Sequence, residues 1–380
     1  MRQSEAQMLR RSRFRNIHVA RAAAPVLSVI AGSVLVSLPS ARADAIWSDS
    51  SGNWNVSSNW LSTNGTVLPP GTGVVATPNT GPVTFIGNGG SVSFGGPDVG
   101  VNRFDIGYSA GRDFAGTGAL TMTAGAINTD QDHLIGDGAT GTLNVAGGSF
   151  YTKDTKQTFV GVTADGTINL TAGNMYLSRY GFVSGGGVGT LNMSGGNLEF
   201  RAFAGTLIDT SNNQILLDNI NFSGGTLGGA AGSGGGVHNV TITSVSGSGS
   251  IAYRKNTGAT VTFDIAGNNA WAGSMSPASN GTATSAYGIL AKTGIGTLTL
   301  TNTQNLKREI QVSGGTLVLD YSTLPTGLLD DDAGISLRGG TLKLSGNGGT
   351  TTEVMGTAQR SVPTSAARQS SSAPTAEQWS

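Results

Sequence analysis

The sequence predicts an all-β protein, a right-handed parallel β-helix (β-solenoid) with coils of about 23–25 residues. Three observations lead to this prediction. Four segments nearly repeat one another, polar and apolar residues alternate strictly within each segment, and 60 of the 380 residues are glycine. Glycine therefore has more than twice its usual share of about 7%. Because there is no Gly-X-Y period, this abundance indicates many tight turns in a packed chain and not collagen.

The four segments have a constant spacing. Each contains a Gly-Thr or Gly-Ala step followed by Leu or Ile, and these glycines lie 23, 25 and 23 residues apart. A spacing near 24 residues is typical of solenoids, in which each repeat forms one coil and stacks on the next. The four segments are GTGALTMTAGAI (116–127), GDGATGTLNVAGGSF (136–150), ADGTINLTAGNM (164–175) and GVGTLNMSGGNL (187–198).

The alternation in each segment predicts a half-buried strand. Leu143 should lie in an interior column between Leu120 and Ile168 of the neighbouring coils. Asn144, Asn169 and Asn192 point the other way and should form an outward amide ladder. Gly-Gly or Ala-Gly pairs after each strand, and a further apolar patch before the next repeat, predict three strands and three corners per coil. An antiparallel sandwich is the competing interpretation, but it does not require the same residue at the same coil position.

The first 43 residues predict a secretory signal peptide. Six arginines precede the apolar run AAAPVLSVIAGSVLVSL, and Ala41-Arg42-Ala43 provides small residues for cleavage before Asp44. A membrane anchor is the alternative, although the run is short and contains Pro25. We therefore expect an exported protein that is extracellular or attached to the cell surface, with the periplasm as the other possible location.

One stretch near the C-terminus resembles a known repeat. The segment LAKTGIGTLTL (290–300), followed by SGGTLVL (313–319), is similar to the autotransporter-associated β-strand repeat of surface and secreted proteins from Gram-negative bacteria. The match is closest from Lys292-Thr293-Gly294 to Gly296-Thr297-Leu298, and LKRE (306–309) departs from the usual turn. The resemblance implies a passenger-type β-helix and brings no catalytic residues with it.

Charge and cysteine content exclude several classes of function. After removal of the leader the chain has 15 basic and 21 acidic residues, so no basic stripe is left to bind nucleic acid. The absence of cysteine excludes disulfides, thiolate metal sites and thiol nucleophiles. We expect no cofactor, no metal and no transmembrane domain in the mature chain. Residues 101–350 should form the β-helix repeat region, and residues 351–380 a disordered, truncated or frame-shifted tail.

Residues 44–100 are predicted to be an N-terminal capping segment rich in tryptophan. Trp47, Trp54 and Trp60 could form a carbohydrate-stacking platform, since a flat ring packs well against a sugar. The alternative is that they cover the open end of the solenoid, where an exposed coil edge would invite aggregation. The second interpretation is favoured.

The candidates for catalysis are few. In TDQDH, Asp130, Asp132 and His133 form the densest acidic cluster and the best candidate for a calcium or sugar site. A solvated loop is the simpler interpretation, because no carboxylate recurs at one coil position. His133 and His238 are too far apart in sequence for a two-histidine motif, and both are predicted to be surface turn residues. Asp330, Asp331 and Asp332 are predicted to form a polar turn before the next strand.

The sequence thus predicts a structural or adhesin-like surface protein without catalytic activity. The alternative is a β-helix protein that binds or degrades polysaccharides. Surface glycans or other cell-surface proteins are the expected partners.

Overall fold

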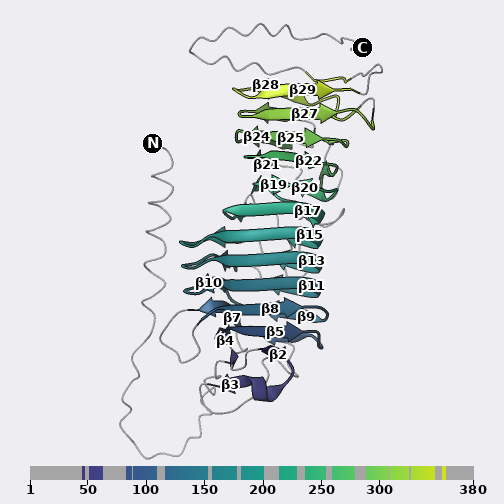
Figure 1. Ribbon diagram of the computed structural model, residues 1–380. Helices are drawn as coiled ribbons and strands as arrows, with labels where there is room; N and C mark the ends of the chain where they lie inside the picture. The colour runs from purple at the N-terminus through teal and green to yellow at the C-terminus, as the bar shows by residue number, and fades with distance from the viewer. Residues whose placement is uncertain are drawn as a thin grey trace, which may run out of the picture. The chain divides into compact units, whose positions relative to one another are not determined.

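The computed structural model describes residues 45–47, 51–62, 83–87, 89–108, 116–152, 156–177, 181–200, 214–228, 236–253, 259–278, 288–306, 308–324, 327–346 and 353–356. These residues form a parallel β-solenoid, which confirms the predicted fold class. Figure 1 shows the strands stacked in chain order, except at the N-terminal end, where the third strand lies outside the first. The predicted leader (residues 1–43) lies outside the described residues.

Three sheets run along the stack. Sheet A has thirteen strands, and each strand pairs in parallel with the next except β1 and β3, which are antiparallel. In spatial order its strands are β28 (Gly334–Leu337), β26 (Glu309–Val312), β24 (Ile289–Thr293), β21 (Thr260–Asp264), β18 (Asn239–Ile242), β16 (Gln214–Leu216), β14 (Phe182–Ser184), β12 (Thr158–Val160), β10 (His133–Asp137), β7 (Arg103–Tyr108), β4 (Val83–Ile86), β1 (Ala45–Trp47) and β3 (Trp60–Ser62).

Sheet B has twelve strands and sheet C has four, and all their pairs are parallel. The main path of sheet B is β2 (Ser51–Asn53), β5 (Gly90–Phe94), β8 (Gly118–Met122), β11 (Gly141–Thr152), β13 (Gly166–Leu177), β15 (Gly189–Phe200), β17 (Asn219–Leu227), β20 (Ser250–Tyr253) and β23 (Ser274–Pro277). Beside this path lie β6 (Val99–Val101), β9 (Ala126–Thr129) and β19 (Ser244–Val245). Sheet C contains β22 (Asn268–Trp271), β25 (Thr297–Leu300), β27 (Thr316–Asp320) and β29 (Thr341–Ser345), and a short 3-10 helix, η1, spans Ser57–Asn59.

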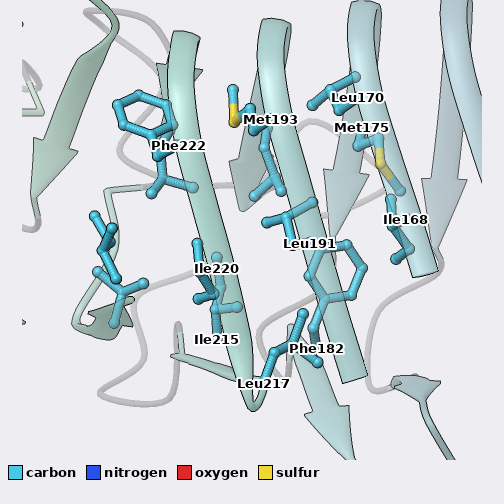
Figure 2. Close-up of a cluster of buried hydrophobic side chains, with 14 of the residues drawn as sticks. Ile168, Leu170, Met175, Phe182, Leu191, Met193, Ile215, Leu217, Ile220 and Phe222 are labelled. Carbon is cyan, nitrogen blue, oxygen red and sulfur yellow. The ribbon is translucent and has the colours of Figure 1, made fainter. Parts of the chain in front are cut away.

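The strands pair in the register that the repeats predict. Leu143 lies opposite Leu120 on one side and Ile168 on the other, and all three side chains are buried. Their column continues through Leu191 and Ile220. Figure 2 shows part of this core, in which aliphatic side chains of β13, β15 and β17 meet Phe182 and Ile215 of sheet A. Like side chains stack on like, so a coil that could not bury its own apolar residues is covered by its neighbours.

Glycine is required at the corner in the middle of each long strand of sheet B. Gly148 has a φ of 70°, a conformation that L side chains rarely adopt. A Cβ atom there would also lie 2.3 Å from the carbonyl oxygen of Gly125 in the preceding coil. The close approach of successive coils therefore fixes glycine at this position.

The β-helix begins earlier than predicted. β4 pairs in parallel with both β1 and β7, and β2 pairs in parallel with β5, so the stack continues across residue 100. In the described residues, parallel pairing therefore extends to both sides of the expected boundary between the capping segment (44–100) and the repeat region (101–350). Parallel pairing needs only a register of backbone groups, and residues 83–101 supply it without matching the repeat sequence.

Part of the predicted tail is also ordered. Glu353 accepts hydrogen bonds from the backbone N–H groups of Leu328 and Leu329, both at 3.0 Å, and from the Tyr321 hydroxyl at 2.9 Å. The N–H of Gly356 donates to the carbonyl of Ala333 at 3.0 Å. Residues 353–356 are thus fastened to the last coils, whereas the rest of the predicted tail lies outside the described residues. Burial raises the pKa of Glu353, and its three hydrogen bonds oppose this rise.

Lys292, in the segment that resembles the autotransporter-associated repeat, is buried. Its ammonium group donates to the carbonyl oxygens of Thr293, of Gly294 at 3.0 Å and of Gly314 at 3.3 Å. Burial lowers the pKa of Lys292, and the Asp264 carboxylate opposes this shift. One lysine thereby satisfies carbonyl groups at the corners of two successive coils.

Candidate functional site

The three tryptophans proposed as a sugar platform are buried. Trp47, Trp54 and Trp60 are each 0% exposed. The Trp60 ring packs edge-on against Trp47 and Trp54, with both pairs of centroids 4.9 Å apart, and its N–H donates to the Trp54 carbonyl at 2.7 Å. These indoles therefore offer no ring face to a sugar, and they fill the interior at the N-terminal end of the stack.

His133 is a core residue, so its assignment as a surface turn residue is wrong. It lies on β10 and is 1% exposed. Its Nε2 is 2.6 Å from Thr129 Oγ1, and its Nδ1 accepts a hydrogen bond from the Phe104 N–H at 3.3 Å. These contacts fit a neutral ring with its proton on Nε2. Burial, together with the charge of Arg103, lowers the pKa of His133 to about 3.

The aspartates near His133 do not join it in a site. Asp130 is buried, and the Asp132 carboxylate accepts a hydrogen bond from the Gln157 N–H at 2.8 Å in the next coil. His133 is buried in the core, and the Asp132 carboxylate bonds the backbone of the next coil. The histidine and this carboxylate therefore do not face one another across a common site.

The remaining candidates are turn residues. Asp330 accepts a hydrogen bond from the Asp332 N–H at 3.1 Å, so the three aspartates form the predicted polar turn before β28. His238 is partly exposed immediately before β18, where its carbonyl accepts from the Thr260 N–H at 2.8 Å. Among the residues that the structure describes, no three His, Asp or Glu side chains lie close enough to hold a metal ion.

The outward face of sheet B carries the predicted asparagine ladder, which we define as Thr121, Asn144, Asn169, Asn192 and Asn221. Each asparagine donates from Nδ2 to the residue before it in this series, over 3.1 Å to Thr121 Oγ1 and then over 2.7, 2.8 and 2.7 Å to successive Oδ1 atoms. A chain of five uncharged side chains thus follows the solenoid axis, with a repeat equal to the strand spacing of about 4.8 Å.

A second outward column differs from this ladder. Asn128, Tyr151, Tyr176 and Glu199 lie opposite one another on β9, β11, β13 and β15, and we call them the tyrosine column. The rings of Tyr151 and Tyr176 are stacked, with centroids 4.5 Å apart and planes 14° from parallel. Both tyrosines are partly exposed. This column was not predicted from the sequence, although Tyr151, Tyr176 and Glu199 repeat with the coil spacing.

The tyrosine column ends at an incompletely bonded carboxylate. Glu199 is 4% exposed, and its Oε2 is 3.5 Å from Nδ2 of Asn197. Within the described part of the chain, Oε1 of Glu199 and Oδ1 of Asn197 are buried without a hydrogen-bond partner. Unsatisfied buried acceptors are costly, by about 1–3 kcal/mol each, so these two atoms lower the stability of the fold.

A shallow hollow lies on the strands β16, β18 and β21 of sheet A. Its volume is about 250 Å³, and no charged side chain lines it. The lining consists of Ile215, Leu216, Asn239, Val240, Thr241, Thr260 and Thr262. With only hydroxyl, amide and aliphatic groups, the hollow holds no titratable group for acid–base chemistry.

No family model, curated protein or solved structure matches this chain. The described residues also contain no helix that is long and apolar enough to cross a membrane.

Proposed function

We propose that the chain is an exported structural and adhesin-like protein of the cell surface, without catalytic activity, and that it belongs with proteins carrying the autotransporter-associated β-strand repeat. The asparagine ladder is the observation that carries this proposal. Five successive coils place uncharged hydrogen-bonding groups at one outward position, linked over 2.7–3.1 Å. A surface that repeats one chemical group suits contact with an extended partner.

Polysaccharide binding is a second candidate, favoured by the stacked Tyr151 and Tyr176 beside uncharged amides. Tyrosine is common in binding surfaces because it combines a large apolar ring with a polar hydroxyl. Polysaccharide degradation is less well supported. Hydrolysis normally needs two carboxyl groups that flank the glycosidic bond, and the carboxylate of Asp132 already bonds the backbone of Gln157.

Localisation and adhesion test the proposal. Expressed in a Gram-negative host, the protein should begin at Asp44 by N-terminal sequencing and should be degraded when intact cells are treated with a protease. Cells displaying it should adhere to glycan-coated or cell-coated surfaces more than cells with an empty vector do. A protein that keeps its first 43 residues and stays in the cytoplasm, or measurable turnover of a polysaccharide, would contradict the proposal.

A further inference from the structure

We propose that the hollow on β16, β18 and β21 of sheet A is a binding site for one sugar ring of a neutral glycan. The polar side chains that line it are Asn239, Thr241, Thr260 and Thr262. This inference deepens the polysaccharide-binding candidate of the proposed function and rests on it for its biological setting. The chemistry of the ligand follows from the groups that line the hollow.

The four polar side chains lie at the corners of a small rectangle on the outward face of the sheet. Asn239 is paired with Thr260, and Thr241 with Thr262, on the adjacent strands β18 and β21. The valine between the two polar residues of each strand is buried, so all four polar side chains face outward. Adjacent strands are about 4.8 Å apart and alternate residues of a strand about 6.6 Å apart, so the rectangle is comparable in size to a sugar ring.

A ligand can reach all four of these side chains. Thr241 is exposed, and Asn239, Thr260 and Thr262 are partly exposed around the hollow. In the part of the chain that the structure describes, none of the four makes a side-chain hydrogen bond. They are therefore hydrated in the free protein, and a ligand replaces water at groups that are already at the surface.

The lining groups specify a neutral ligand that both donates and accepts hydrogen bonds. A threonine hydroxyl and an asparagine amide each do both. No charged side chain lines the hollow, so it offers neither a cation for an acidic group nor a carboxylate for a metal ion. Sugar hydroxyl groups meet this requirement. Leu216, which is 43% exposed and follows the residue paired with Val240, supplies an apolar contact for the C–H groups of the ring.

The size of the hollow limits the ligand to one ring. Its volume of about 250 Å³ is below the range of about 300–1,000 Å³ that is typical of sites for drug-sized molecules. One sugar unit of a glycan can therefore occupy the hollow, while the rest of the glycan stays outside it.

Other classes of ligand fit these strands less well. A peptide that binds through its main chain adds to a free strand edge, whereas β16, β18 and β21 are each paired on both sides. A second copy of this chain would need about 800 Å² from each partner, far more than a hollow of this size offers. A purely apolar ligand would cover the hydroxyl and amide groups without replacing their hydrogen bonds to water.

Saturation-transfer difference NMR of the full chain tests the site. The probes are the methyl glycosides of glucose, mannose, galactose and N-acetylglucosamine, with glucuronic acid as the charged comparison. We expect saturable binding of at least one neutral glycoside, in the millimolar range, and no binding of glucuronic acid. Thr262→Val keeps the shape of the side chain and removes its hydroxyl, so it should weaken binding about fivefold, the equivalent of about 1 kcal/mol.

Two further variants separate binding from folding. Thr241→Arg puts a long side chain into the hollow and should abolish binding. Because Thr241 is exposed, the melting temperature of this variant should stay within about 2 °C of the wild-type value. Thr299→Val is the matched control, since Thr299 is a partly exposed, outward-facing threonine on β25 of sheet C, and it should change binding less than twofold.

Five results would overturn the inference. The first three are no saturable binding of any neutral glycoside, equally strong binding of glucuronic acid, and wild-type binding by Thr262→Val or Thr241→Arg. The others are an equal loss in Thr299→Val, and a loss in Tyr176→Ala without a loss in the hollow variants, which would place the site on the tyrosine column. Failure of export would contradict the proposed function and leave the binding result intact. An exported, adhesive protein that binds none of the glycosides would contradict only this site.

Discussion

Replacing Leu143 by aspartate tests the stacking of the coils most directly. Leu143 is 1% exposed and lies between Leu120 and Ile168, which are both 0% exposed. The new carboxyl group would stand in the interior column, with aliphatic side chains above and below it. Neither neighbour can donate a hydrogen bond to it.

The cost has two parts. Loss of the leucine side chain from a packed core costs about 2–5 kcal/mol. A carboxyl group buried there must also become neutral, and a pKa raised by about three units costs about 4 kcal/mol at pH 7. The sum, about 6–9 kcal/mol, is comparable to the whole stability of a typical domain, about 5–15 kcal/mol.

Asn144→Asp is the matched control, one position along the same strand. Asn144 points outward, where its Nδ2 donates to Thr121 Oγ1 at 3.1 Å and its Oδ1 accepts from Asn169 at 2.7 Å. A carboxylate still accepts from Asn169, so only the donated hydrogen bond is lost. The expected cost is about 1 kcal/mol.

Urea unfolding followed by far-ultraviolet circular dichroism measures both variants. Limited proteolysis locates the damage, which should centre on β8, β11 and β13 because each coil contacts mainly its neighbours. If the two variants lose the same free energy of unfolding, then Leu143 and Asn144 do not face opposite sides of β11, and the solenoid assignment of this strand is refuted.

Four further predictions follow from single contacts. His133 has a pKa of about 3 in the folded state and about 6.5 in the unfolded state, so between these pH values only the unfolded state binds the extra proton. The free energy of unfolding should therefore be at its maximum above pH 6.5 and should fall by about 3 kcal/mol by pH 4. In His133→Asn, the free energy of unfolding should lose most of this pH dependence. Burial raises the pKa of Glu353, so residues 353–356 should be bound more tightly to the last coils when Glu353 is protonated and less tightly as pH rises through that pKa. Hydrogen exchange at the N–H groups of Leu328 and Leu329 should therefore become faster over that pH range, and Glu353→Gln should abolish the pH dependence. Lys292→Met should leave corner carbonyls without a donor, cost about 2–4 kcal/mol and speed hydrogen exchange in β24 and β26, whereas unchanged exchange would contradict the buried role. Gly148→Ala should cost at least about 2 kcal/mol in thermal unfolding, because its φ is 70° and Gly125 leaves no room for a Cβ atom.

The interior columns and the asparagine ladder could be predicted because two periods coincide in the sequence. Alternation along the strand assigns Leu143 and Asn144 to opposite faces, and the spacing of about 24 residues assigns each its neighbours. Parallel in-register stacking then leaves no freedom in the pairing, and the structure has the expected partners.

His133 could not be placed in the same way, because burial of a polar ring depends on partners from other parts of the coil. Its surroundings in sequence, TDQDH, are those of a solvated corner. Burial becomes possible because Thr129 and the backbone N–H of Phe104 meet both ring nitrogens. Neither contact leaves a periodic signal. The tryptophans could not be placed from the sequence either. Their spacing within residues 47–60 does not tell whether the rings cover the core or face a ligand.

The tyrosine column was missed for a different reason, and that reason bears on function. Stacking requires aliphatic residues at the interior positions and glycine at the corners, whereas an outward position needs only a side chain that tolerates its neighbours. Short polar residues meet that need, as the asparagine ladder shows. Tyr151, Tyr176 and Glu199 occupy one outward position with three bulky or charged side chains, and the carboxylate is buried with an unsatisfied oxygen. That oxygen contributes nothing to the stability of the fold, whereas the Oδ1 atoms of Asn144 and Asn169 in the ladder each accept a hydrogen bond from the next coil. A comparison of the coils for identical residues identifies the positions that build the scaffold and overlooks an outward position occupied by different residues. In a repeat protein, the outward positions at which the residue type changes from coil to coil are therefore the ones to examine for a ligand.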